Sequence, residues 1–461
     1  MRKDWNGLRV VILGAARQGL ALARFLARQG AVVTLSDQRP SDQMQPAVSS
    51  LEGVAVRWVL GGHPLEMLKG ADMLCLSGGV PLELPIVAEA RRRSIPLSND
   101  SQIFMDSVPC PVIGITGSAG KTTTTTLVGR MAEAAVSAPL KAWVGGNIGT
   151  PLIDRLDEIG TGDIVVLELS SFQLELMAAS PHIVAILNIT PNHLDRHGTM
   201  QAYISAKARI LAFQSQQDYA ILGREDPGAW SLAPQVRGRL FSFGEAKPPA
   251  GETGAFVKND FLCFQAGKRV VELAPRSLVA LRGRHNLLNV LAACSVASAA
   301  GFGSGAIQVG LAGFTGVAHR LEFVRRFNGA AWYNDSIATA PERTIAAIQS
   351  FAEPLVLLLG GRDKNLPWED LANLVHQRVD HVIVFGETAP KILQALGPQQ
   401  PGRRPYTLSS CATLQEAVQA ASRVAGEGDV VLLSPGGTSF DEFTDFEERG
   451  EHFRQWVNQL S

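Results

Sequence analysis

Residues 114–127 read GITGSAGKTTTTTL, and this stretch decides how the rest of the chain is interpreted. The preceding run, PCPVIG (residues 109–114), is short and apolar, which predicts a buried strand that enters a tight turn. The residues that follow, TTTTTLVGRMAEAA, predict the helix that leaves the turn. A strand, a glycine-rich turn and a helix in this order are typical of a loop that binds phosphate groups.

The residue types in this loop have a chemical reason. Glycines let the backbone bend so that its N–H groups approach an anion, and the helix N-terminus adds about half a positive charge there. Lys121 would reach the outer phosphates, and Thr122 would offer its hydroxyl to Mg²⁺. The spacing departs from the usual motif, because five residues separate Gly114 from Gly120 and Ile115 stands where the first glycine is expected. The core TGSAGKT still predicts nucleotide binding, with a purely structural turn as the alternative.

The composition is that of an ordinary globular protein, with 46% hydrophobic and 18% charged residues. A length of 461 residues favours about three domains. The net charge of −1 provides no basic footprint for nucleic acid or an anionic membrane. The five cysteines form no CxxC pair, which indicates small buried side chains in a reducing compartment.

The amino-terminal apolar run is too short for a signal peptide, and no stretch approaches the ~20 apolar residues that span a bilayer. The sequence therefore predicts a soluble, cytoplasmic protein.

Strands and helices alternate along the chain, which predicts an α/β fold with parallel sheets. We expect three domains, which are residues 1–108, 109–316 and 317–461. Residues 255–273 carry three short β-rich runs, split by Asn259-Asp260 and Ala266-Gly267, and so predict a small meander in the central domain. In the last domain, three apolar runs close in glycine and predict another doubly wound sheet.

Two stretches of the central domain could complete a nucleotide site. Glu168 follows four apolar residues in DIVVLELSSFQLE, where a carboxylate could hold the metal of a phosphate loop, or could be an exposed strand tip. In NITPNHLDRHG, the side chains His193, Asp195 and His197 resemble a metal cluster, although a solvated turn has the same pattern. Both stretches follow apolar runs, and ligands of α/β sheets bind at such strand ends.

The first domain opens with GAARQG (residues 14–19) after one strand and Asp37 after the next. This order resembles a dinucleotide fingerprint, but Ala16 stands at the second glycine position. We therefore favour a different nucleotide, held by the turn and by Asp37 or Arg39, over NAD.

The motifs ITGSAGKTT, GGNIGTPL, VVLELSSFQLE, NITPNHLDRHG, YISAKARI, RGRHNLLN, VAHRLE and YNDSIAT occur in the order found in the Mur ligases. The resemblance covers nearly the whole chain. LELSSFQLE and the tail SPGGTSFDEFTDFEERG resemble the branch that adds glutamate.

The resemblance implies a UDP-binding Rossmann-like domain, a central phosphate-loop ATPase domain and a Rossmann-like C-terminal domain that closes on ATP and glutamate. It also implies a cytoplasmic, monomeric enzyme of peptidoglycan precursor synthesis. ATP would convert the carboxylate of UDP-MurNAc-L-alanine into an acyl phosphate, which the amine of glutamate attacks. The products would be ADP, phosphate and UDP-MurNAc-L-alanyl-glutamate.

The resemblance also assigns roles to single residues. The catalytic residues would be Lys121, Glu168, His193 and Lys207. Two Mg²⁺ ions would be held by Thr122 with Glu168, and by His193 with a carbamylated Lys207. ATP would be bound by Gly117, Ser118, Ala119, Gly120, Lys121, Thr122, Thr123, Asn286, Asn289, Arg320 and Asp335. The UDP-substrate would be bound by Gly14, Arg17, Gln18, Gly19, Asp37, Arg39, Ser77, Gly79, Asn147 and His193. Glutamate would be bound by Thr339, Lys364, Ser439, Phe440 and Phe446.

Several positions depart from the family pattern. Ile337 replaces the lysine of the usual NDSKAT, the usual SPG of the first domain is Ser77-Gly78-Gly79, GTNGKT is GSAGKT, and the C-terminal SPACAS type is SPGGTS. The pattern with isoleucine at this position is similar to that of a variant ligase that adds L-glutamate. We therefore expect D-glutamate as the substrate, with L-glutamate as the alternative.

Three rival interpretations remain at this point. A folyl-polyglutamate synthetase relative would share the phosphate loop but lack the UDP-binding domain. An NAD-dependent oxidoreductase would use GAARQG and need no ATP. A nucleotide-regulated binding protein would bind ATP without releasing phosphate.

Overall fold

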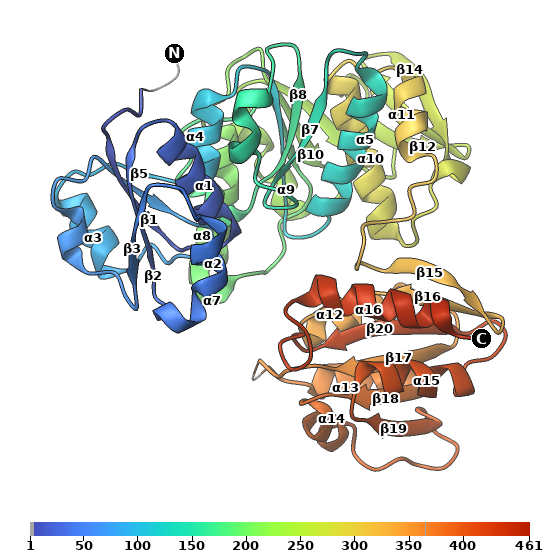
Figure 1. The fold of residues 1–461 in the computed structure, drawn as a ribbon. Coiled ribbons are helices and arrows are strands. Elements are labelled where there is room, and N and C mark those ends of the chain that lie inside the picture. Colours follow the sequence, from blue (N-terminus) through green and yellow to red (C-terminus); the bar gives the residue numbers. More distant parts are fainter. Residues whose placement is uncertain (1–3, 365) are drawn as a thin grey trace. The chain divides into compact units, whose positions relative to one another are not determined.

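A computed structural model describes residues 4–364 and 366–461, and only the backbone of Asp195. Within this part of the chain there are three sheets, of five, nine and six strands. Figure 1 shows them in blue, in green to yellow, and in orange to red. The α/β class and the arrangement in three sheet domains are confirmed.

The chain divides into two compact units. The first unit carries the first two sheets and consists of the chain up to residue 279 together with residues 284–314. The second unit carries the third sheet and consists of residues 280–283 and 315–461.

The first sheet is parallel throughout, in the order β3-β2-β1-β4-β5. Its strands are β1 (Arg9–Leu13), β2 (Val32–Asp37), β3 (Val56–Leu60), β4 (Met73–Leu76) and β5 (Leu97–Ser98). Its helices are α1 (Arg17–Arg28), α2 (Gln45–Ser50), α3 (Pro85–Arg92) and α4 (Asp100–Ser107), with 3₁₀ turns at Ser41–Gln43 and Leu65–Leu68. Parallel strands need crossover connections, and α1 provides the first by burying Leu22, Phe25 and Leu26.

The nine-stranded central sheet has the order β14-β13-β12-β11-β10-β9-β6-β8-β7. Its strands are β6 (Val112–Thr116), β7 (Ala142–Gly146), β8 (Ile164–Glu168), β9 (Ile183–Ile186), β10 (Tyr219–Gly223), β11 (Arg239–Phe243), β12 (Gly254–Lys258), β13 (Phe261–Ala266) and β14 (Arg269–Pro275). Only β12, β13 and β14 pair antiparallel, and they form the predicted meander. Asn259 and Asp260 both have positive φ angles, which suits the turn of a tight hairpin.

Helices and 3₁₀ turns of the same unit connect these strands. The helices are α5 (Lys121–Ala135), α6 (Ser171–Leu174), α7 (Leu194–His197), α8 (Met200–Ala208), α9 (Pro227–Trp230), α10 (Arg284–Ala299) and α11 (Ser304–Leu311). The 3₁₀ turns are Leu152–Glu158, Arg209–Leu211, Ala233–Gln235 and Arg276–Leu278.

The position of β6 fixes where a ligand can bind. The chain passes from β6 to β7 and β8 on one side, and then to β9 on the other side of β6. Such a reversal of strand order opens a crevice at the carboxyl ends of the strands. In the register of the sheet, Ile115 pairs with Glu168 and Thr116 pairs with Ile186, so three strand ends meet there.

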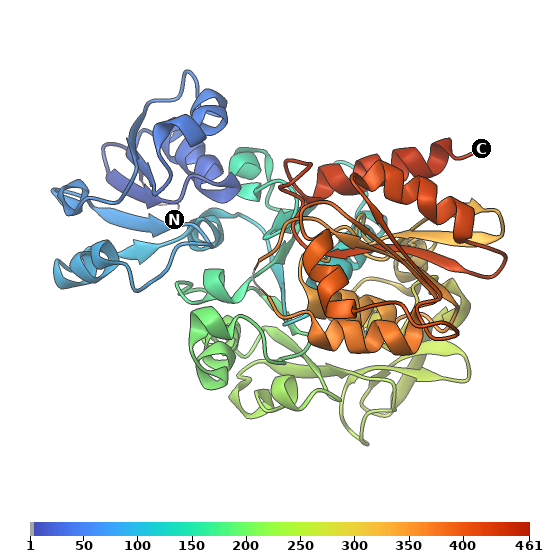
Figure 2. The ribbon, with the colours of Figure 1, turned by 90° about the horizontal axis from the view of Figure 1, so that it is seen from below.

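The third sheet has the order β15-β16-β20-β17-β18-β19. Its strands are β15 (Glu322–Phe327), β16 (Ala330–Asn334), β17 (Leu355–Gly360), β18 (His381–Phe385), β19 (Thr407–Cys411) and β20 (Val430–Gly436), and its helices are α12 (Pro341–Ile348), α13 (Glu369–Arg378), α14 (Ala389–Leu396), α15 (Leu414–Val424) and α16 (Phe446–Gln459). Helices α12 to α14 pack on one face, and α15 and α16 on the other (Figure 2).

One edge of this sheet was not predicted. Strands β15 and β16 form an antiparallel hairpin, whereas the other pairs are parallel. Asn328 and Gly329 make its turn, both with positive φ angles. Arg325 and Arg326 interrupt the apolar pattern of β15, so the strand lacks the continuous run that marks its buried neighbours.

The short segment 280–283 belongs to the second unit through Arg282. Its guanidinium forms an ion pair with Glu353. It also lies 5.7 Å from the ring centre of Tyr333 and 5.8 Å from that of Phe351. These contacts hold the segment against the edge of the third sheet.

Candidate functional site

The predicted phosphate loop is a turn between β6 and α5, as expected. Gly117 has φ 157° and Gly120 has φ 82°, which a residue with a side chain rarely adopts. The loop is anchored to the chain after β9: the Ser118 amide donates to the Asn188 carbonyl at 2.9 Å, and the Ala119 amide donates to Asn188 Oδ1 at 2.8 Å. The turn is therefore held at both of its central residues.

Two lysines converge on this loop. Lys121 Nζ and Lys207 Nζ each donate to the Gly117 carbonyl at 3.0 Å. Lys207 also donates to Thr116 Oγ1 at 3.3 Å, and it is 1% exposed. Burial, and secondly the charge of Lys121, hold the pKa of Lys207 well below its usual value, while Glu168 acts in the opposite direction. Burial thus favours the uncharged, nucleophilic amine of Lys207 more than it is favoured in an exposed lysine.

Glu168 and Thr122 supply oxygens of the kind that Mg²⁺ prefers. Thr122 Oγ1 donates to Glu168 Oε2 at 2.8 Å, and Asn147 Nδ2 donates to Glu168 Oε1 at 3.0 Å. Glu168 is 2% exposed, so it is not an exposed strand tip. A buried carboxylate needs a cation or donors, and this one lies beside the phosphate loop, so the residues fit a magnesium ion bound with a nucleotide.

His193 precedes α7 and His197 is its last residue, and the two have different surroundings. His193 is exposed and has φ 53°, whereas the side chain of His197 is 1% exposed. His197 Nδ1 lies 3.1 Å from Glu175 Oε1, and its Nε2 lies 2.9 Å from Ser171 Oγ. The ring of Phe172 stacks on His197 and meets His193 edge-on, both at 5.2 Å between ring centres.

The metal cluster suggested by the His193, Asp195 and His197 pattern is not seen as such. The side chain of Asp195 lies outside the described residues. Among the side chains that are described, no group of three or more His, Cys, Asp or Glu could hold a metal ion. His197 is engaged by Ser171 and Glu175, which makes it a packing residue of this turn.

Asn289 on α10 borders the phosphate loop. A Cβ atom at Gly120 would lie 2.1 Å from Asn289 Oδ1, so a side chain there would force Asn289 to move. Asn289 Nδ2 donates to Asn286 Oδ1 at 3.2 Å, and Thr124 Oγ1 lies 3.5 Å from the Asn289 carbonyl. Thr123, in the first turn of α5, is buried. The two asparagines predicted for ATP therefore lie together at this loop.

The turn between β1 and α1 is held by close packing at Gly19 and by hydrogen bonds from two other segments. A Cβ atom at Gly19 would lie 1.9 Å from the Gly14 carbonyl oxygen, and Ser77 Oγ donates to that same oxygen at 2.8 Å. Asp37 Oδ2 accepts from the Ala15 amide at 2.8 Å. Gly14, Gly19, Ser77 and Asp37, all predicted for the UDP-substrate, thus surround one turn.

The positively charged side chain of Arg39 pairs with Asp37 beside this turn. Its Nε and Nη2 atoms donate to the two carboxylate oxygens of Asp37, each at 2.9 Å. This hydrogen-bonded ion pair is the main reason why the pKa of Asp37 lies well below its usual value. Gln18 and Gly79 lie at the same edge, where a Cβ atom on Gly78 would lie 3.2 Å from Gln18 Oε1.

Two arginines connect this turn with the central sheet inside the first unit. Arg17 Nη2 lies 3.5 Å from the Asn147 carbonyl oxygen, and Arg196 Nη1 donates to the Gly79 carbonyl at 3.0 Å. Arg196 also lies over the ring of Phe172, 5.0 Å from its centre. The candidate UDP residues and the residues around Glu168 are thus neighbours.

The remaining ATP candidates belong to the second unit. Asp335 follows β16 and accepts from the Leu321 amide at 3.2 Å and from Ser434 Oγ at 2.8 Å. Burial raises its pKa to about 7, while these hydrogen bonds and the charge of Arg320 oppose the shift. Its carboxyl group is therefore partly protonated at neutral pH.

The glutamate candidates line the carboxyl ends of β16, β17 and β20. Lys364 Nζ donates to Thr339 Oγ1 at 3.2 Å. Ser439 is 2% exposed and Phe440 is 59% exposed, both in the segment after β20. Phe446 opens α16, and its carbonyl accepts from Ser336 Oγ at 2.8 Å.

Four further residues, which were not predicted, contact these candidates or residues next to them in the chain. Asn188 holds the phosphate loop, and Tyr203 OH lies 3.0 Å from Ser118 Oγ. The buried Arg449 donates to the Ser336 and Gly437 carbonyls, and Arg343 donates to the Ile337 carbonyl. Only Tyr203 had a sequence signal, because it lies four residues before Lys207 on one helix and so shares its face.

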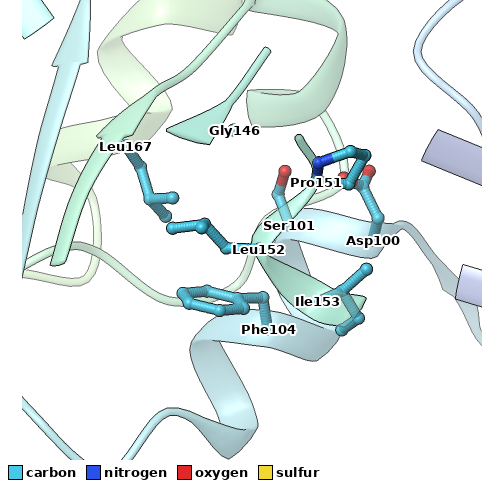
Figure 3. A pocket seen from close by; sticks show the side chains of 8 residues that line it. All are labelled: Asp100, Ser101, Phe104, Gly146, Pro151, Leu152, Ile153 and Leu167. Atoms are coloured by element: carbon cyan, nitrogen blue, oxygen red, sulfur yellow. The ribbon is translucent and has the colours of Figure 1, made fainter. Parts of the chain in front are cut away.

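A separate small cavity lies between α4 and the segment after β7 (Figure 3). Its volume is about 10 Å³, and Asp100, Ser101, Phe104 and Pro151 are among its walls. This is room for about one water molecule, which excludes the cavity as a nucleotide site. Asp100 Oδ1 is buried without a hydrogen-bond partner, and burial raises the pKa of Asp100 to about 6.

Comparison with known proteins identifies the chain by three matches to domain families. Residues 8–98 match the MurD-like N-terminal domain of Mur ligases, residues 115–297 the Mur ligase middle domain, and residues 319–437 the glutamate ligase domain of Mur ligases. No helix of the described residues is long and apolar enough to cross a membrane.

Full-length relatives agree with these matches. The chain is 41% identical over 456 residues to UDP-N-acetylmuramoylalanine–D-glutamate ligase of Symbiobacterium thermophilum, covering 98% of both chains. It is 37% identical over 462 residues to the ligase of the same name from Acetivibrio thermocellus, covering all of this chain and 98% of the relative. The crystal structure of MurF ligase from Thermotoga maritima in complex with ADP has the same fold, with a TM-score of 0.56 at 16% identity over the full length of both chains. The chain therefore belongs to the Mur ligase family.

Proposed function

We propose that this protein is an ATP- and Mg²⁺-dependent ligase that joins D-glutamate to UDP-N-acetylmuramoyl-L-alanine through an acyl phosphate. The observation that carries the proposal is the convergence of Lys121 and Lys207 on the Gly117 carbonyl, beside the buried Glu168. The names of the full-length relatives supply the identity of the two substrates.

Amide formation needs activation, because a carboxylate does not react with an amine in neutral water. In the proposed reaction the substrate carboxylate attacks the γ-phosphorus of ATP, ADP leaves, and the glutamate amine then displaces phosphate from the acyl phosphate. Lys121 would stabilise the charge on the phosphoryl group in transfer, where fixed cations in a site shielded from water are most effective.

Mg²⁺ would neutralise the charge of the phosphate oxygens, and the residues proposed to hold it divide into two sets. Thr122 and Glu168 form the first set, which their mutual hydrogen bond supports. His193 and Lys207 form the second. A protonated lysine cannot bind a cation, so this set needs a carbamate on Lys207. The lowered pKa of Lys207 favours the uncharged amine that captures CO₂.

The UDP-substrate would extend from the first sheet to Glu168. Its nucleotide would bind at the turn between β1 and α1 and at the ends of the neighbouring strands. The residues proposed to contact it are Gly14, Arg17, Gln18, Gly19, Asp37, Arg39, Ser77 and Gly79. Its muramoyl end would reach Asn147 and His193. The contact of Arg196 with the Gly79 carbonyl supports this direction, because it joins the two ends of the proposed path inside one unit.

The residues proposed for ATP are divided between the units. The phosphate loop, Thr123, Asn286 and Asn289 belong to the first unit, and Arg320 and Asp335 to the second. The proposed reaction therefore requires both units to act on one ATP molecule, with the C-terminal domain closing for catalysis.

We also propose that the domain boundaries lie at 108/109 and 316/317 and that the protein is a monomer. We propose that it acts in the cytoplasm, where ATP and the nucleotide-sugar substrate are available.

The decisive experiment incubates the protein with ATP, Mg²⁺, UDP-N-acetylmuramoyl-L-alanine and one glutamate enantiomer at a time, and measures phosphate release. We expect release with D-glutamate. Phosphate release with L-glutamate alone would show that the protein is the L-glutamate-adding variant. Ile337 is the residue that raises this alternative. No release with either enantiomer would reject the glutamate ligase proposal. Oxidation of NAD(P)H without ATP would instead support an oxidoreductase.

A further inference from the structure

Two cationic side chains contact the loop after β16 at neighbouring points. Arg343 Nη1 donates to the Ile337 carbonyl at 3.2 Å, and Lys364 Nζ donates to Thr339 Oγ1 at 3.2 Å. The Thr339 amide also donates to the Ile337 carbonyl at 2.9 Å, which ties the two contact points together. A guanidinium and an ammonium group therefore stand over one short turn of the second unit.

The positive charge at this turn is only partly balanced. Partial burial, and secondly the charge of Arg343, lower the pKa of Lys364. Burial, and secondly the charge of Arg320, lower the pKa of Arg343, although both side chains remain accessible to water. Glu342 and Asp335 act in the opposite direction on Arg343. Asp335 is itself partly protonated near neutral pH, so it compensates these cations incompletely.

Cations gathered in this way repel one another, and an anion relieves the repulsion. Arg343 lies in the first turn of α12, whose N-terminus adds a partial positive charge at the same place. A guanidinium binds a carboxylate through two parallel N–H groups, whereas an ammonium group acts as a point charge. Arg343 and Lys364 thus suit two carboxylates of one small molecule.

The side chain at position 337 sharpens this assignment. Ile337 is uncharged where the family pattern has lysine, so it cannot itself bind a carboxylate. The guanidinium of Arg343 is instead hydrogen-bonded at this residue's carbonyl. Arg343 therefore places a positive charge next to Ile337, whose own side chain carries none.

We propose that Arg343 binds the side-chain carboxylate of the incoming glutamate while Lys364 binds the α-carboxylate, and that Arg343 thereby selects an amino acid with two carboxylates. This inference rests on the proposed glutamate ligase function. It predicts that the enzyme discriminates glutamate from glutamine mainly through Arg343, because glutamine lacks the second charge.

The test compares Arg343→Gln and Arg343→Lys with the wild-type protein, using phosphate release at saturating ATP and UDP-substrate. In Arg343→Gln we expect the KM for glutamate to rise about 10- to 100-fold, the loss of one charged hydrogen-bonded pair. The KM for ATP, measured separately at saturating glutamate, should not change. Arg343→Lys should recover part of the loss, since it keeps the charge but not the two-pronged geometry.

The second readout is the ratio of kcat/KM for glutamate to that for glutamine. Removing Arg343 should reduce this ratio by the same factor, because only glutamate loses a contact. Arg423→Gln is the matched control, since it removes an exposed arginine from the last turn of α15 in the same unit. This control should leave every KM unchanged.

The outcomes separate the inference from the function on which it rests. A wild-type protein that releases no phosphate with glutamate rejects the proposed function itself. An active wild type with an unchanged glutamate KM in Arg343→Gln overturns only the role of Arg343. A raised KM for ATP with an unchanged KM for glutamate would also overturn it, because Arg343 would then contact phosphate beside Arg320.

Discussion

The turn after β1 and the turn after β6 share one plan but have opposite chemistry. Each follows a buried parallel strand and precedes a helix. A Cβ atom on Gly19, in the first turn of α1, would clash with the Gly14 carbonyl, and one on Gly120 would clash with Asn289. The first turn carries the carboxylate of Asp37, paired with Arg39. The second carries the amines of Lys121 and Lys207. The two turns have a similar backbone, and under the proposed function the charged groups beside them would select different ligands.

The largest expected effect comes from removing the amine of the second turn. Lys121→Ala should lower kcat by at least about 100-fold, since it removes a cation from the transferring phosphoryl group. Calorimetric binding of the UDP-substrate should remain nearly intact, because the first turn is unchanged. Loss of both properties together would show that the two turns do not act separately. Lys258→Ala, an exposed lysine of β12, is the control.

The second expected effect concerns the chemical form of the other amine. The lowered pKa favours the uncharged amine of Lys207, which is the form that binds CO₂, and acidification should reverse this binding. Lys207→Ala should be nearly inactive and should need more Mg²⁺. Small carboxylic acids should restore part of the activity by replacing the carbamate. An active Lys207→Ala protein with normal Mg²⁺ dependence would contradict the assignment.

A smaller effect is expected at the first turn. Asp37→Asn keeps the acceptor for the Ala15 amide but removes the charge that pairs with Arg39. The KM for the UDP-substrate should rise about 10-fold, as expected for one charge-assisted contact, while the KM for ATP stays constant. Asp42→Asn, an exposed carboxylate nearby, serves as the control. A change confined to the KM for ATP would reverse the roles assigned to the two turns.

The smallest expected effect concerns stability rather than activity. Asp100 has a pKa of about 6 in the folded protein and 3.8 as its ordinary value, so the folded state holds the proton more tightly. Its burial therefore lowers stability as the pH rises from about 4 to about 6, by at most ~3 kcal/mol. Asp100→Asn should raise the melting temperature above pH 6 and flatten its pH dependence. The same pH profile of thermal unfolding in Asp100→Asn and the wild type would show that folding does not shift the pKa of Asp100.

The sequence was most informative where function depends on local order. Apolar runs that end in glycine predicted β6, β17, β18 and β20, and the phosphate loop was evident from Gly117, Gly120 and Lys121. The hairpin of β15 and β16 was missed because it lies at a sheet edge, where charged residues replace the apolar run.

The site was less predictable where it depends on long-range packing. Lys207, taken alone, has the pattern of a solvated helical lysine, and only the family resemblance indicated a role. Its burial results from contacts with Thr116, Gly117 and Tyr203, which come from other segments or another turn of its helix. Asn188 contacts a loop that is distant in the chain, and Arg343 contacts a backbone carbonyl. No residue spacing in the sequence predicts such contacts.

The contacts of Arg282 have a practical consequence for dissecting the enzyme. A C-terminal fragment that begins at residue 315 would leave Arg282 behind, so Glu353 would lose its ion pair and the rings of Tyr333 and Phe351 would lose their cationic cover. Such a fragment is expected to be less stable than the same region in the intact chain. A fragment of this region should therefore include residues 280–283, joined to residue 315 by a short linker, so that the contacts of Arg282 are kept.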